Sequence, residues 1–100
     1  MTHIKNFHVT IPPLGEALKG VFLCEDDVQL YARALGNCWT LYTWWIHRGS
    51  SGNAVRSSFT ASLHVFTAAV SNNDRLLGFY TVQNAYFALH RTYCLQLQGD

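Results

Sequence analysis

The stretch VQLYARALGNCWTLYTWWI, residues 28–46, decides the fold. Its large apolar residues recur at intervals of three and four, the period of one face of an α-helix. Asp26 and Asp27 precede it, and carboxylates at a helix N-terminus interact favourably with the helix dipole. The spacing therefore predicts a helix over residues 26–48. The residues that carry the period are Val28, Tyr31, Leu35, Trp39, Tyr42 and Ile46.

Two features of this stretch oppose a helix. Gly36 costs up to about 1 kcal/mol relative to alanine inside a helix. Residues 38–46 are rich in threonine and aromatic side chains, which are typical of strands. We interpret the stretch as a helix because its period begins earlier, at Val28, and keep a strand over residues 38–46 as the alternative.

Two more helices are predicted downstream. Residues 54–70 carry apolar side chains at helical spacing, after the glycine- and serine-rich residues 49–53. Ser71, Asn72 and Asn73 interrupt the pattern, and a third helix is predicted over residues 74–96. Its apolar residues cover nearly half of its circumference, so we expect it to be central or to contact a partner.

Residues 1–24 have a different pattern. Residues 7–11 alternate as in a half-buried strand, Pro12 and Pro13 end that pattern, and residues 21–24 form a short apolar run. Between them, residues 15–20 have room for at most one helical turn. We predict an extended or β-hairpin arm. The fold class is thus mainly α, a small three-helix bundle with an N-terminal arm in a single domain over residues 1–100, with α+β as the alternative.

Composition points towards association. Apolar residues make up 49% of the chain and charged residues only 13%, about half the usual charged fraction. We therefore expect a packed core and a surface that a partner covers in part. The net charge is +1, and the basic residues stand singly, which argues against nucleic acid as the partner.

Cysteine usage and hydropathy point to the cytoplasm. The three cysteines follow neither a CxxC motif nor a regular spacing, so we expect free thiols in a reducing compartment. We see neither a secretory signal nor an apolar stretch long enough for a membrane span, and we expect no contact with a membrane.

A partner-binding surface is predicted on the outer side of the first long helix. Leu41, Trp44 and Arg48 group together in a helical projection, opposite the face of Leu35 and Tyr42. Tryptophan and arginine are the side chains that most often anchor protein interfaces. The alternative, which we weigh equally, is that the N-terminal arm covers this face. Tyr86 and Tyr93 are further candidates for contact with a partner.

No motif indicates catalysis, a cofactor or a metal. His90 and Cys94 share a helix face, but no second pair of compatible ligands completes a metal site. We expect a non-enzyme, although Cys38 or Cys94 with a histidine base stays open. One alternative is a small enzyme or ligand-binding domain with a pocket near His90, Tyr86 and Cys94.

Arg48 and Arg56 flank a glycine- and serine-rich connector before a predicted helix N-terminus. Backbone N–H groups at such a position bind anions. The pair is therefore a weak candidate for an anion-binding site, and a solvated connector is the simpler interpretation.

The pattern as a whole favours a non-enzymatic protein-binding module. We expect a small inhibitor or adaptor that sterically blocks or bridges a larger protein or protein complex, as accessory proteins of phages or plasmids do. Self-association through the same surface would give a homodimer. The other alternative is a nucleic-acid-binding helical domain, which would use Arg48, Arg56, Arg91 and Lys5.

Overall fold

The computed structural model describes residues 12–49 and 53–99. Over these residues the chain forms four α-helices and no strand: α2 (Pro12–Leu18), α3 (Glu25–Arg48), α4 (Asn53–Ser71) and α5 (Val82–Gly99). The predicted mainly α fold is confirmed. Residues 1–11 of the predicted arm lie outside the described residues.

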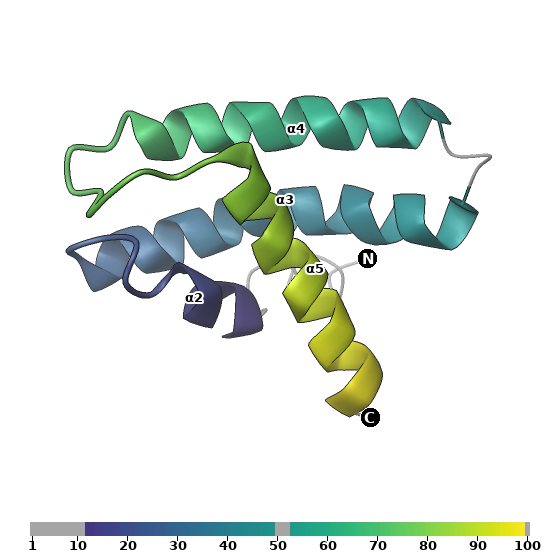
Figure 1. Cartoon of the computed structure of the whole chain (residues 1–100), viewed down its shortest axis with the longest axis horizontal. Helices are drawn as coiled ribbons and strands as arrows, with labels where there is room; N and C mark the ends of the chain where they lie inside the picture. Colours follow the sequence, from purple (N-terminus) through teal and green to yellow (C-terminus); the bar gives the residue numbers. More distant parts are fainter. Residues whose placement is uncertain (1–11, 50–52, 100) are drawn as a thin grey trace.

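α3 and α4 are the two longest of the described helices and lie side by side (Figure 1). The tryptophan-rich residues 38–46 are helical throughout, so the strand alternative is wrong. The helical period that begins at Val28 outweighs the strand preference of residues 38–46, because a helix places Leu35, Trp39 and Tyr42 together in the core. The predicted bounds of both helices agree with the structure to within one residue.

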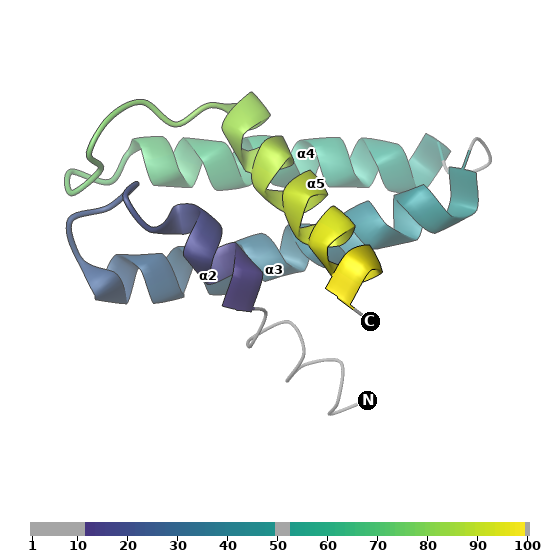
Figure 2. The ribbon, with the colours of Figure 1, turned by 60° about the horizontal axis from the view of Figure 1, so that its bottom comes forward.

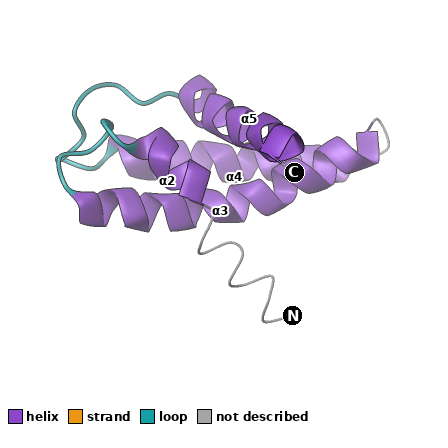
Figure 3. Ribbon diagram, turned by 90° about the horizontal axis from the view of Figure 1, so that it is seen from below, coloured by secondary structure: helices purple, strands orange, loops and turns teal. Residues whose placement is uncertain are grey.

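α5 crosses the α3–α4 pair obliquely, and α2 lies beside α5 (Figure 2). The view from below shows α2 and α5 on the same side of α3 (Figure 3). All four helices contribute to one hydrophobic core. Its fully buried side chains include Leu14, Leu18, Leu35, Trp39, Tyr42, Val70 and Leu89.

The described part of the predicted arm is corrected by the structure. Pro12–Leu18 is a helix of 7 residues rather than an extended segment. Proline is favourable at the start of a helix because its fixed φ fits and its missing N–H has no partner there. Leu14 and Leu18, one turn apart, are both fully buried, which holds this short helix in place.

The apolar run of residues 21–24 begins in a turn at Val21 and does not form a strand, but Phe22 within it pairs with a residue beyond α4. Phe22 forms an isolated antiparallel bridge with Leu76. The Leu23 N–H donates to the Arg75 carbonyl at 3.0 Å, and the Leu77 N–H donates to the Val21 carbonyl at 2.8 Å. The bridge ties the α2–α3 connection to the α4–α5 connection.

The third predicted helix is wrong at its start. α5 begins at Val82 rather than at residue 74. Backbone pairing with residues 21–23 holds Arg75 and Leu77 in a non-helical conformation. The Thr81 hydroxyl accepts a hydrogen bond from the Asn84 N–H at 3.1 Å, which caps the helix.

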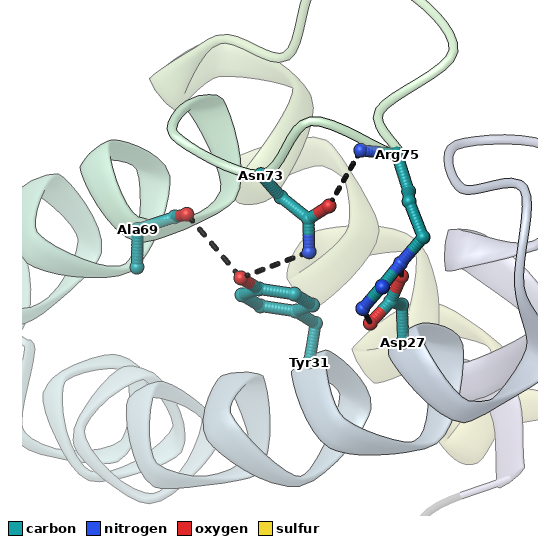
Figure 4. Close-up of polar contacts among 5 residues, drawn as sticks. All are labelled: Asp27, Tyr31, Ala69, Asn73 and Arg75. Carbon is teal, nitrogen blue, oxygen red and sulfur yellow. Dashed lines mark hydrogen bonds and ion pairs between the residues drawn. The ribbon is translucent and has the colours of Figure 1, made fainter.

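A polar cluster joins the start of α3 to the α4–α5 connection (Figure 4). Arg75 donates two hydrogen bonds to the buried carboxylate of Asp27, the longer at 2.8 Å. This bidentate pair holds the pKa of Asp27 below its usual value. The Tyr31 hydroxyl donates to the Ala69 carbonyl at 3.3 Å and accepts from the Asn73 amide at 3.4 Å. These contacts fix the α4–α5 connection on α3.

None of the described helices combines the length and the apolar character that a membrane crossing requires.

Candidate partner-binding surfaces

Trp44 lies on the outside of α3, as the helical projection predicts. Its side chain is 47% exposed, whereas Trp39, five residues earlier, is 2% exposed. The Arg48 guanidinium lies over the Trp44 ring, 4.9 Å from its centroid. Leu41 is half-buried and packs against the core. We call Leu41, Trp44 and Arg48 the Trp44 surface.

Arg48 and Arg56, the two residues of the predicted anion site, each pack on a different tryptophan. Arg56 lies over the Trp45 ring, 5.9 Å from its centroid. Trp45 in turn stacks on Phe59 of α4, with ring centroids 5.7 Å apart. Residues 50–52, whose backbone would hold the anion, lie outside the described residues.

Tyr86 and Tyr93 belong to an aromatic cluster around Tyr42 where α5 crosses α3. Their ring centroids lie 5.7 and 6.0 Å from that of Tyr42, both in edge-on geometry. Both side chains are half-buried and pack against the core. The structure thus places these two candidates around the buried Tyr42, whereas Trp44 is exposed.

A row of partly apolar depressions lies beside α2 and α5. It consists of three adjoining depressions of about 310, 370 and 390 Å³. The first two share Ala17 and Phe87, and the last two share Ala17 and Arg91. We call this feature the α2–α5 groove.

Large apolar side chains border the groove and face solvent. Phe79 is 97% exposed and Phe87 is 69% exposed. Leu77, beside Phe79, and Leu95, at the opposite end near Pro12, are exposed as well. Monomeric proteins rarely leave a contiguous apolar surface of this kind uncovered unless it binds something.

Arg91 lies beside the groove and lines two of its depressions. No carboxylate occurs in the sequence from residue 75 to residue 99. Glu16, which also lines the groove, forms an ion pair with Lys19 at 2.9 Å. Among residues 12–49 and 53–99, Arg91 has no ion-pair partner.

The predicted pocket near His90 is only partly present. His90 and Arg91 line the middle depression of the groove, while Tyr86 and Cys94 do not. Instead, the Tyr42 hydroxyl and His90 Nδ1 form a hydrogen bond of 2.8 Å, and Cys94 Sγ lies 3.7 Å from His90 Nε2. Burial raises the pKa of Tyr42 well above its usual value.

Sequence analysis missed Phe79 and Phe87 as exposed residues. The sequence feature that indicated such exposed residues was the wide apolar stripe of the third predicted helix. This stripe is wider than one buried helix face requires. The face of α5 that packs on the other helices includes the small residues Ala85 and Ala88, both of which are buried. Leu89 is buried as well, whereas Phe87, Leu95 and Leu97 of the same helix are exposed.

No three potential metal ligands gather in the part of the chain that the structure describes. Comparisons with protein-family models, with curated proteins and with solved structures found no match to this chain.

Proposed function

We propose that this chain is a non-enzymatic protein-binding module that covers an apolar segment of a larger protein with its α2–α5 groove. It would act sterically, as an inhibitor or an adaptor. The observation that carries the proposal is the exposure of Phe79 and Phe87, which line the adjoining depressions of the groove. Aromatic side chains of this kind anchor protein interfaces.

The chemistry of the groove defines the partner segment. Its apolar wall requires apolar side chains opposite Phe79 and Phe87. Arg91 lacks a carboxylate on its own helix, so the segment is expected to supply an aspartate or glutamate. We therefore propose an apolar segment with one acidic residue beside it.

Estimates of the binding free energy indicate how much of the groove the partner must contact. Burying one phenylalanine contributes about 1.5–3 kcal/mol. A micromolar Kd requires about 8 kcal/mol net of the costs of association. Two phenylalanines are insufficient, and docking must extend from Leu77 to Leu95. The Trp44 surface is proposed as a second contact on the same partner.

The test is quantitative capture from lysates of the source cells with matched variants. Phe87→Ser removes an exposed side chain of the groove. Val65→Ser removes a side chain that is 71% exposed on α4. We expect wild type and Val65→Ser to retain one stoichiometric partner and Phe87→Ser to lose it. Equal capture by all three proteins, or by none, would contradict the proposal.

Charge reversal tests the acidic residue of the partner. Arg91→Glu is expected to weaken capture at least about tenfold, while Arg33→Glu, an exposed arginine on α3, leaves it unchanged. Light scattering on the isolated chain tests whether a second copy of the chain, rather than a different protein, occupies the groove. A wild-type dimer that Phe87→Ser converts to a monomer would assign the groove to a second copy.

A further inference from the structure

Cys94, His90 and Tyr42 form a chain of polar contacts where α5 crosses α3. Cys94 Sγ lies 3.7 Å from His90 Nε2, and His90 Nδ1 lies 2.8 Å from the Tyr42 hydroxyl. We infer that Cys94 is a modification site, a reactive thiol that undergoes exchange with low-molecular-weight disulfides. In this arrangement His90 is the proton acceptor and Tyr42 is the residue that positions it.

The His90 ring is held on two sides. Tyr42 is fully buried, so its hydroxyl is a fixed partner for Nδ1. The Tyr86 ring stacks on the imidazole, with centroids 6.1 Å apart and an interplanar angle of 5°. The second ring nitrogen is left facing Cys94, one helical turn further on. A nucleophile beside a base that a third group orients is the arrangement of an activated thiol.

The exchange is balanced in atoms and electrons. The Cys94 S–H proton passes to His90 Nε2, while Nδ1–H donates to the Tyr42 oxygen and supports the imidazolium. The thiolate then attacks one sulfur of the small disulfide. A new S–S bond to Cys94 forms as the reagent's S–S bond breaks. The leaving thiolate takes the proton from His90 and departs as a thiol.

The other two cysteines lack this environment. Cys38 is buried in the core beside the Ser62 hydroxyl, 3.0 Å away, and burial raises the pKa of its thiol. Cys24 is half-buried just before α3, and no hydrogen bond joins it to a histidine among the described residues. Cys94 is half-buried next to an exposed histidine. Reagents can therefore reach it.

The test is the rate at which each cysteine is modified in one sample. Wild type is treated with oxidised glutathione, and separately with iodoacetamide, and the three cysteines are resolved by peptide mass spectrometry. We expect the glutathione adduct to form first at Cys94. His90→Gln is expected to lower the rate at Cys94 relative to Cys24 by about tenfold, the size of one lost charge-assisted hydrogen bond.

The same sample contains its own controls. Cys38 stays unmodified as long as the variant is folded, so loss of structure is seen directly. His64→Gln makes the same substitution at an exposed histidine of α4 and is expected to leave the ratio of Cys94 to Cys24 unchanged. Tyr42→Phe keeps the ring and is expected to lower that ratio by about threefold. A glutathione adduct formed first at Cys24, or an unchanged ratio in His90→Gln, would overturn the proposal. An unchanged ratio in Tyr42→Phe would overturn the role of Tyr42.

Discussion

Tyr42 and Tyr80 are both buried, but their hydroxyl groups have different surroundings. The Tyr42 hydroxyl is hydrogen-bonded to His90 Nδ1 at 2.8 Å. The Tyr80 hydroxyl is buried without a hydrogen-bond partner among the described residues. Burial and the nearby Cys38 thiol raise the pKa of Tyr80 to about 12. A buried hydroxyl that gains no partner is a net cost to the folded state.

The substitution of tyrosine by phenylalanine is therefore expected to have opposite signs at the two positions. Tyr80→Phe removes the unpartnered hydroxyl and should raise the free energy of unfolding by about 0.5–1 kcal/mol. Tyr42→Phe leaves His90 without its partner and should lower it by about 1 kcal/mol. Urea unfolding followed by tryptophan fluorescence measures both. A loss of equal size at both positions would show that Tyr80 has a partner in solution.

At the scale of elements, periodicity is enough to predict α3 and α4 but not the start of α5. In α3 and α4 one stripe of large side chains faces one core, so the sequence pattern and the burial agree. The segment before α5 has the same apolar period, yet its backbone pairs with residues 21–23, which are more than fifty positions away. A long-range pairing leaves little local signal. The local signals present were Gly78 and the cap residue Thr81.

Of the candidate sites, the one that depends on a single helix could be predicted from the sequence, and the one that depends on helix packing could not. The outward position of Trp44 depends only on the geometry of its own helix, and it was predictable. The α2–α5 groove depends on where α5 crosses the bundle. That crossing buries Ala85 and Ala88 and leaves Phe87 outside, which a projection of α5 alone does not indicate.

The bridge between Phe22 and Leu76 can be tested through a backbone donor. The Leu77 N–H donates to the Val21 carbonyl at 2.8 Å, while the Leu77 side chain is exposed. Leu77→Pro removes the donor and is expected to lower the free energy of unfolding by about 1–3 kcal/mol relative to Leu77→Ala. Chemical denaturation of the two variants gives the difference. Equal stabilities would mean that the bridge contributes nothing to the fold.

At the scale of the whole molecule, the main question is whether the short helix α2 belongs to the same cooperative unit as the α3–α4 pair. α2 has 7 residues, too few to be stable alone in water. Its two buried leucines belong to the same core cluster as Trp39 and Leu89. A shared core implies that α2 unfolds together with the rest. The groove, which α2 borders, would then be as stable as the bundle itself.

A leucine pair tests this cooperativity. Leu18→Ala should lower the free energy of unfolding by about 2–5 kcal/mol, whereas Leu23→Ala, at an exposed leucine, should change it by less than about 0.5 kcal/mol. The decisive measurement is the urea concentration at which half of the Cys38 thiol can be labelled. Cys38 lies in the core, on α3 rather than on α2. In a single cooperative unit this midpoint falls in Leu18→Ala together with the helical circular dichroism signal. If α2 unfolds on its own, the Cys38 midpoint stays at its wild-type value, and the groove would then have to form when the partner binds.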